Sequence, residues 1–336
     1  MKYLLYISLI WLGKYSFTLD LHSSNIQYLS QLYNPALTGL NNELDASLTY
    51  RTQWRKLGSP FTAYAASFGS ILKPFSKHRK GKFALGGNLY KEQMAANASC
   101  TSFSVSPTYH LKLTENSSLS LGFNIGYYGV SFNEANGSWE SQHNGLYFDE
   151  NIISGEVFQS ATQHAFDLGS GLIYTLKNSW DMKIIQVGGS LFHLNKPNLS
   201  FTSAGQSKLP IRKVAFASVS IPFGKSFSYV ELKGLYQNQQ NFKSLTYGAM
   251  IKIKLLEKAL FTSSNSKMNS LYLGFGAYIR QNDAFIINLS LQRVNWKLGI
   301  SYDLTTSKLQ EANNKQGATE LQFWYTIPSF KDKGKI

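Results

Sequence analysis

The sequence contains a single cysteine, Cys100, so no disulfide can form within the chain. A lone cysteine inside an apparent strand is usually a small buried hydrophobic side chain, and we expect that role here. Charged residues are also scarce, at 15% of the chain, against roughly 25% in an average soluble domain. Aromatic residues are abundant at 14%. This balance suits a sheet whose two faces meet different solvents better than it suits a globular enzyme.

The chain also lacks an apolar run long enough for a membrane-spanning helix. After Leu12, no stretch approaches the roughly 18 apolar residues that such a helix needs. The first 12 residues carry Lys2 and then a short apolar core, which is typical of a secretory signal peptide. We assign residues 1–23 to this peptide and expect cleavage between residues 17 and 24. An exported chain of this kind is either soluble beyond the inner membrane or a β-barrel.

The motifs of common catalytic sites are missing. There is no HExxH, no phosphate-binding glycine loop and no G-x-S-x-G, and no two histidines have metal-ligand spacing. We therefore expect no enzyme, no cofactor and no metal. His110 and His193 are interpreted as interior or girdle residues, and Asp167 and Asp303 as ion-paired acids on the polar face of their strands.

What the sequence does contain is a period of two in hydrophobicity. In residues 117–132, large apolar side chains alternate with Ser, Gly and Asn. Many such segments run ten or more residues, the length of tilted transmembrane strands, whereas soluble strands cluster near five or six residues. Their polar face carries Gly, Ser, Asn and isolated charges, as the lumen of a barrel would. The alternation slips at Tyr127–Tyr128, which predicts a β-bulge there.

Counting these segments predicts an all-β fold: a single antiparallel transmembrane β-barrel of about 14 strands, within residues 43–327. An even number places both termini on the periplasmic side of the outer membrane. The predicted strands are 43–52, 61–71, 82–91, 99–113, 117–132, 164–176, 181–194, 210–221, 226–237, 242–255, 269–280, 284–292, 294–304 and 318–327.

The connections between these segments alternate in length and charge. Those after the fifth, seventh and thirteenth strands are long, and those after the fourth, sixth, eighth and twelfth are short, as in bacterial barrels with long outer loops. The connections after the second and tenth strands are longer than this pattern predicts. The long loop 133–163 contains five carboxylates and no Lys or Arg. The formal net charge of +14 lies largely on the inferred periplasmic side, in the tail 328–336 and in a basic patch of Lys73, Lys77, Arg79, Lys80 and Lys82.

This basic patch raises the question of nucleic-acid binding. It contains one aromatic residue, Phe75, and therefore no platform on which bases could stack. We expect no nucleic-acid partner. The alternatives are acidic proteins, anionic lipid headgroups of the outer membrane, or no partner at all.

Two motifs near the start of the chain resemble a known family. Residues 34–39 read N-P-A-L-T-G, and residues 50–54 read Y-R-T-Q-W. Together they resemble the opening of the PorP/SprF family of type IX secretion membrane proteins, and the resemblance spans most of the chain. We interpret residues 24–42 as a periplasmic lead-in, where Pro fixes a turn that closes the mouth or leads into the first strand. Its motif residues are Asn34, Pro35, Ala36 and Gly39, followed by Arg51, Gln53 and Trp54. By alternation, Arg51 should face inward and meet a luminal carboxylate.

The resemblance implies an outer-membrane component of type IX secretion or gliding motility in a Bacteroidetes-type bacterium. It implies two classes of partner: a secreted surface protein bound through its C-terminal sorting domain, and periplasmic lipoproteins. In the acidic loop, Trp139, Tyr147 and Phe148 are candidate partner contacts, because hot spots are rich in aromatic residues. The alternative for this loop is a solvated plug of the mouth. The alternatives for the protein are a passive porin or hydrophobic-solute transporter, and an exported soluble β-sandwich.

Overall fold

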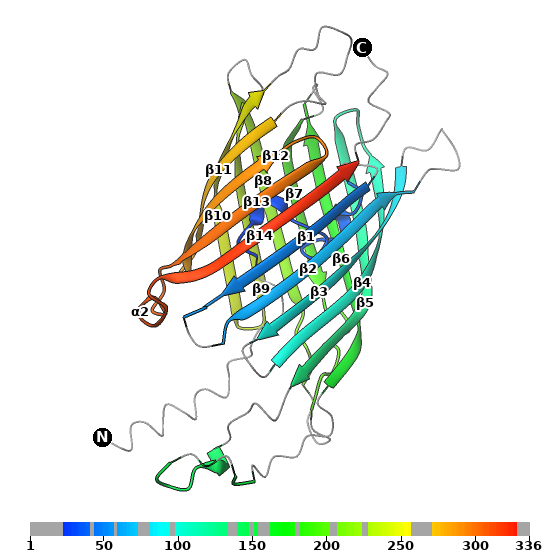
Figure 1. The fold of residues 1–336 in the computed structure, drawn as a ribbon. Coiled ribbons are helices and arrows are strands. Elements are labelled where there is room, and N and C mark those ends of the chain that lie inside the picture. The colour runs from blue at the N-terminus through cyan, green and yellow to red at the C-terminus, as the bar shows by residue number, and fades with distance from the viewer. Residues whose placement is uncertain are drawn as a thin grey trace.

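The described strands close into one barrel. The computed structural model describes residues 23–40, 44–56, 59–72, 81–94, 98–132, 140–147, 149, 151–153, 162–178, 182–201, 207–223, 228–256 and 271–327. Fourteen antiparallel strands pair in sequence order, and β1 also pairs with β14, so the sheet has no free edge (Figure 1). The predicted all-β barrel of about 14 strands is confirmed. None of the described helices is long and apolar enough to cross a membrane.

Each strand begins and ends within three residues of its predicted range. The strands are β1 (Leu44–Gln53), β2 (Phe61–Ile71), β3 (Gly81–Met94), β4 (Ala98–Lys112), β5 (Ser117–Phe132), β6 (Thr162–Lys177), β7 (Lys183–Phe192), β8 (Arg212–Phe223), β9 (Ser228–Gln239), β10 (Phe242–Leu256), β11 (Leu271–Arg280), β12 (Ala284–Gln292), β13 (Trp296–Thr305) and β14 (Gln316–Ile327).

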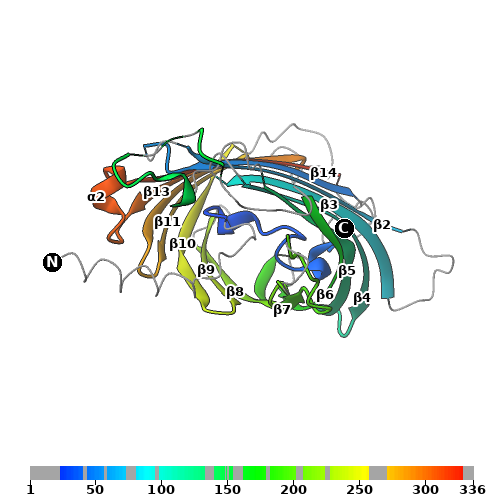
Figure 2. The same ribbon diagram turned by 90° about the horizontal axis from the view of Figure 1, so that it is seen from below.

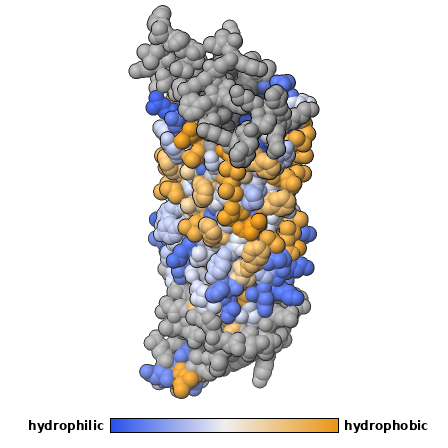
Figure 3. Space-filling model, turned by 90° about the vertical axis from the view of Figure 1, so that its right-hand side faces the viewer, coloured by the Kyte–Doolittle hydropathy of each residue, from blue (hydrophilic) through white to orange (hydrophobic). Residues whose placement is uncertain are grey.

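The period of two separates an apolar outer face from a mixed inner face. On β12, Phe285, Ile287 and Leu289 are exposed on the outside, whereas Ile286 and Asn288 are buried within. Exposed apolar side chains of this kind occur on all the described strands, and they form a hydrophobic band on the face drawn in Figure 3. Such a band is the surface that lipid tails cover in outer-membrane barrels.

The prediction of a β-bulge at Tyr127–Tyr128 is wrong. The register of β5 with both neighbours is unbroken through these residues. Tyr128 and Val130 are buried and continue the inward face of Asn124. The apparent slip arises because the inward positions become apolar here, where they pack with Leu199, Leu209 and other buried residues. Cys100 belongs to the same cluster and is fully buried, which confirms its role as a small hydrophobic side chain.

The two ends of the barrel differ. At the end where β1 begins and β14 ends, which we call the terminal end, the connections after β4, β6, β8 and β12 are short. At the other end, which we call the opposite end, the long connections follow β5, β7 and β13. The predicted alternation of loop length is confirmed for these seven connections. The connections after β2 and β10 at the terminal end are longer, and those after β3, β9 and β11 at the opposite end are short. The terminal end is uppermost in Figure 1.

Residues 23–40 lie inside the barrel, and we call them the plug (Figure 2). They include two short 3-10 helices, η2 (Ile26–Tyr28) and η3 (Pro35–Leu37). The sequence suggested that this segment closes the mouth or leads into the first strand. The structure instead buries it within the lumen, where Ile26, Tyr33 and Ala36 pack on inward apolar side chains of the wall.

Candidate functional site

The turn at Asn34–Pro35 fixes the middle of the plug. Asn34 is extended, with φ −158° and ψ 115°, as a residue before proline should be. Its side-chain oxygen accepts a 2.9 Å hydrogen bond from the amide of Ala36, which caps η3. Its amide nitrogen donates to the carbonyls of Leu172 and Gly189, at 3.2 and 3.0 Å. One side chain thus shapes the turn and joins it to β6 and β7.

The wall has glycine where this turn touches it. A Cβ on Gly171 would lie 2.1 Å from the side-chain oxygen of Asn34, and one on Gly122 would lie 2.5 Å from the amide of Ala36. Both distances are far inside van der Waals contact. The two glycines therefore allow the plug to reach the sheet, and any larger residue at either position would push it away.

Backbone carbonyls of the plug accept hydrogen bonds from side chains of the barrel wall. Buried carbonyls must find donors, and a plug without long helices or strands has few of its own. Five hydrogen bonds to plug carbonyls come from four different strands: Thr108 to Pro35 (2.9 Å), His110 to Thr38 (2.8 Å), Arg212 to Leu32 (2.7 Å), Lys233 to Gln27 (3.0 Å) and Ser190 to Tyr33. These bonds hold the plug on several sides of the lumen.

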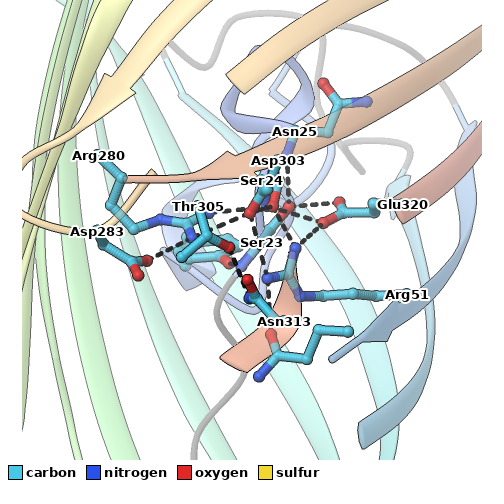
Figure 4. Close-up of polar contacts among 12 residues, drawn as sticks. Ser23, Ser24, Asn25, Arg51, Arg280, Asp283, Asp303, Thr305, Asn313 and Glu320 are labelled. Carbon is cyan, nitrogen blue, oxygen red and sulfur yellow. Dashed lines mark hydrogen bonds and ion pairs between the residues drawn. The ribbon is translucent and has the colours of Figure 1, made fainter. Parts of the chain in front are cut away.

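A cluster of buried charges holds the start of the plug (Figure 4). Arg51 lies 3.3 Å from Glu320 and 3.6 Å from Asp303, and Arg280 lies 3.0 Å from Asp303 and 2.9 Å from Asp283. Ser24 donates its amide hydrogen to Glu320 (2.8 Å) and its hydroxyl hydrogen to Asp303 (2.7 Å). We call Arg51, Arg280, Asp303 and Glu320 the charge cluster. The expected inward orientation of Arg51, toward a luminal carboxylate, is confirmed.

Arg51 and Glu320 also face each other across the seam that closes the barrel. They are direct partners in the register of β1 with β14. Their side chains are 5% and 0% exposed, so water screens the pair very little. The same two residues therefore join the first strand to the last and bind the plug to both.

A second group of charges holds the plug on the other side of the lumen. Glu231 lies 2.9 Å from Lys233 and 3.4 Å from Lys252. Gln27 of the plug donates to Glu231 (2.6 Å) and accepts from the hydroxyl of Tyr278 (3.0 Å). Asp167, predicted to be an ion-paired acid, lies 2.8 Å from His193. Within the described ranges, no three His, Cys, Asp or Glu side chains come together as a metal site.

The structure brings most of the motif residues together. Asn34, Pro35, Ala36 and Gly39 lie in the plug, and Gly39 has φ +60°, a conformation that favours glycine. Gln53 accepts a 2.8 Å hydrogen bond from Arg51. Trp54 follows β1 and packs edge-on against Phe61, with ring centroids 4.9 Å apart.

The other two predicted groups are only partly described. Trp139 and Phe148 lie outside the described residues, as do Lys73, Lys77, Arg79 and Lys80. Tyr147 is 61% exposed in the loop at the opposite end. Lys82 is exposed at the terminal end. The structure joins neither of these two described residues to the plug.

Arg280, Glu231 and Glu320 complete the charged contacts of the plug, and none of the three was predicted as a site residue. The alternation of β9, β11 and β14 could have placed all three in the lumen. The alternation of these strands therefore indicated that the three side chains face the lumen, but the sequence did not show that the plug lies there.

Comparison with known proteins assigns the chain to a family. The sequence profile described as "Type IX secretion system membrane protein PorP/SprF" matches residues 17–325. The chain belongs to this family. The expected resemblance is thus confirmed over most of the chain, and the protein is an outer-membrane component of type IX secretion. No curated protein matches the sequence.

Solved structures similar to this PorP/SprF family member include other outer-membrane barrels. The toluene transporter TbuX of Ralstonia pickettii is 11% identical, with 88% of this chain and 93% of that chain covered and a TM-score of 0.47. A FadL homologue of Pseudomonas aeruginosa is 10% identical, with the same coverage and a TM-score of 0.46. At such low identity these likenesses concern the barrel alone.

The contact between Asn34 and Gly171 gives a first prediction. Gly171→Val should displace the plug and leave the barrel closed, because the added Cβ overlaps the Asn34 side chain while the strand pairing is unaffected. Conductance in planar bilayers should rise, and protease should cut within residues 23–40 of barrels that still migrate as folded in unboiled detergent gels. Gly234→Val is the matched control, since no atom lies within 4 Å of its Cβ position. Equal, low conductance in both variants would contradict the assignment of residues 23–40 as a plug.

The seam pair gives a second prediction. Arg51→Ala should lower the free energy of unfolding by roughly 3–5 kcal/mol, because it leaves a buried carboxylate without its cation. Arg51→Met combined with Glu320→Gln should recover part of this loss, since no buried charge is then left uncompensated. The control is Glu115→Gln in the exposed pair Lys112–Glu115 (3.2 Å), where we expect almost no change. Urea titration in lipid vesicles measures all three, and equal losses for Arg51→Ala and Glu115→Gln would refute the role of the seam pair.

Proposed function

We propose that this protein is a plugged outer-membrane barrel that anchors a secreted surface protein, or helps to export it, for the type IX machinery. The observation that carries this proposal is the plug, which is held by buried ion pairs and by hydrogen bonds from many strands. A general porin needs a water-filled lumen. A lumen that holds a buried segment of the protein's own chain favours a role in binding over passive diffusion.

The orientation in the membrane is part of the same proposal. The terminal end, where the connections after β4, β6, β8 and β12 are short, would face the periplasm, and the opposite end would face the cell exterior, as in other bacterial barrels. The first and last residues of the barrel would then both be periplasmic. The basic patch around Lys82 would meet acidic lipoproteins of the machinery, and its neutralisation would flatten the salt dependence of their co-purification.

The long loop at the opposite end supplies the surface for the secreted partner. Its residues Leu146, Tyr147 and Ile153 are 89%, 61% and 88% exposed. Apolar side chains gathered on one exposed loop are typical of interaction sites. Asp149 is nearby, and two 2.9 Å hydrogen bonds from Asn151 hold the pKa of its carboxyl below the usual value, so the loop retains this negative charge in mildly acidic medium. The partner would bind through its C-terminal sorting domain, with Trp139, Tyr147 and Phe148 as contacts.

Deletion of residues 138–150 tests this function. We expect the barrel to remain folded, because β5 and β6 pair independently of the loop, and we expect the surface partner to be released from cells into the medium. Quantitative mass spectrometry of the surface and medium fractions measures the release. Deletion of residues 202–206, in the long connection between β7 and β8 at the same end, is the control and should leave the partner on the cell. Retention unchanged by the 138–150 deletion would contradict the proposal.

The alternative is a porin or a transporter of hydrophobic solutes. It predicts high conductance, or uptake of apolar solutes, with the plug in place. The bilayer measurement on the unaltered protein therefore separates the two functions, because a plugged anchor should conduct little.

A further inference from the structure

Two lysines lie in one row on the outer face of the barrel, at the opposite end. Lys213 of β8 and Lys243 of β10 are each a direct register partner of Asn238 on β9, which lies between them. Neighbouring strands are about 4.8 Å apart, so the Cα atoms of the two lysines are separated by roughly 10 Å. We call Lys213, Asn238 and Lys243 the lysine row.

Both lysines point away from the lumen. Lys213 lies between the buried residues Arg212 and Val214, and Lys243 precedes the buried Ser244. Because side chains alternate between the two faces of a sheet, the lysines belong to the outer face, where both are exposed. Among the described residues, no carboxylate pairs with either lysine, and the outward positions of β8, β9 and β10 hold no Asp or Glu. The two charges are therefore available to an anionic ligand.

The outer face of the same strands is apolar from the lysine row to the terminal end. On β10, the outward positions after Lys243 are Leu245, Tyr247, Ala249, Ile251, Ile253 and Leu255. The outward positions that pair with them on β9 also carry no charge. On β8, the outward positions after Lys213 are apolar as well and end at Phe223. One face of three strands thus combines a charged edge with an apolar surface.

The length of this surface places the lysine row relative to the membrane. Leu245 and Leu255 are ten residues apart, which is roughly 33 Å along the strand and about 25 Å along the barrel axis at a tilt near 40°. The apolar band of outer-membrane barrels is also about 25 Å tall. The lysine row therefore lies at the headgroup level of one leaflet. At the level of the other leaflet, β8 and β10 expose Phe223 and Leu255 instead.

We propose that the lysine row binds a glycolipid that carries two phosphates on one disaccharide, as lipid A does, in the leaflet at the opposite end. Lysine ammonium groups are compact charges that bind phosphate well. Phosphates at headgroup level meet these charges at the edge of the apolar face, and the acyl chains of the same molecule cover that face.

Two features favour this lipid over a phosphoglyceride. The lysines are roughly 10 Å apart, so two phosphates at the ends of a disaccharide can each meet one ammonium group. The apolar face spans three strands, which suits a lipid with several acyl chains better than one with two. Next to the row, the outward residues Ala215, Ala217 and Gly234 are small, and a Cβ on Gly234 would meet no atom within 4 Å. Acyl chains can therefore lie close to the sheet here.

The contact between lysines and phosphates does not depend on the direction of the barrel. Only the assignment of this leaflet as the outer one rests on the proposed function, through its orientation. The test below is made in detergent, where orientation plays no part, so this proposal and the anchoring of a surface protein can fail separately.

The test titrates the full-length protein in uncharged detergent with diphosphoryl lipid A, and native mass spectrometry measures the bound fraction. We expect tighter binding of this lipid than of phosphatidylglycerol. Lys213→Gln combined with Lys243→Gln should weaken the affinity by about tenfold or more, because each lysine near an anionic headgroup adds to binding. Lys213→Arg combined with Lys243→Arg should retain the affinity, since both charges remain.

The matched control is Lys56→Gln combined with Lys308→Gln, which removes two exposed lysines from the connections after β1 and β13 at the same end. It lowers the net charge equally and should leave the affinity unchanged. Equal affinities of the two glutamine pairs would show only non-specific attraction and would overturn the proposal. Phosphatidylglycerol that binds as tightly as lipid A would overturn the choice of a glycolipid. Displacement of the lipid by inorganic phosphate would show a site for free anions instead. Folding of each variant is checked by its heat-dependent gel migration.

Discussion

The pair of Arg51 and Glu320 links the two features on which the structure depends. A sheet in a membrane must close, because an open edge would leave backbone groups without hydrogen-bond partners in lipid. In this protein the closing seam contains a buried ion pair at direct register, and the same carboxylate binds the amide of Ser24. Closure of the barrel and placement of the plug are therefore coupled through one side chain. A buried pair has a large desolvation cost, so its value lies in holding this geometry more than in added stability.

The plug also explains why the inner wall is neither uniformly polar nor uniformly apolar. Ile26 and Tyr33 need apolar neighbours and find them in Ile173, Phe216 and other inward residues. The carbonyls of the same segment need donors and find them in His110, Arg212 and Lys233. The residue type at each inward position thus matches the group of the plug that it contacts. A barrel that enclosed only water would not need this pattern.

Much of the barrel followed from the sequence because lipid imposes a simple rule on the outer face. Every second residue must be apolar, so the 14 strands and their ends could be read from alternation alone. The inner face follows no such rule, and this produced the error at Tyr128 and Val130, where an apolar interior looked like a change of face. The inward orientation of Arg51 was predictable by parity, but its partner Glu320 is far away in sequence. The position of Asn34 depends on Gly171 of β6, and no local pattern connects a turn to a distant glycine.

Charged side chains of the wall hold the start of the plug from two sides of the lumen. On one side, Arg51 and Arg280 lie 3.0–3.6 Å from the carboxylates Asp303 and Glu320, and both carboxylates accept hydrogen bonds from Ser24. On the other side, Glu231 lies 3.4 Å from Lys252 and accepts a hydrogen bond from Gln27. The middle of the plug is bonded to β6 and β7 through Asn34. Displacement of the plug would therefore break buried hydrogen bonds to several strands together, and such connected buried contacts specify one arrangement of the segment in the lumen.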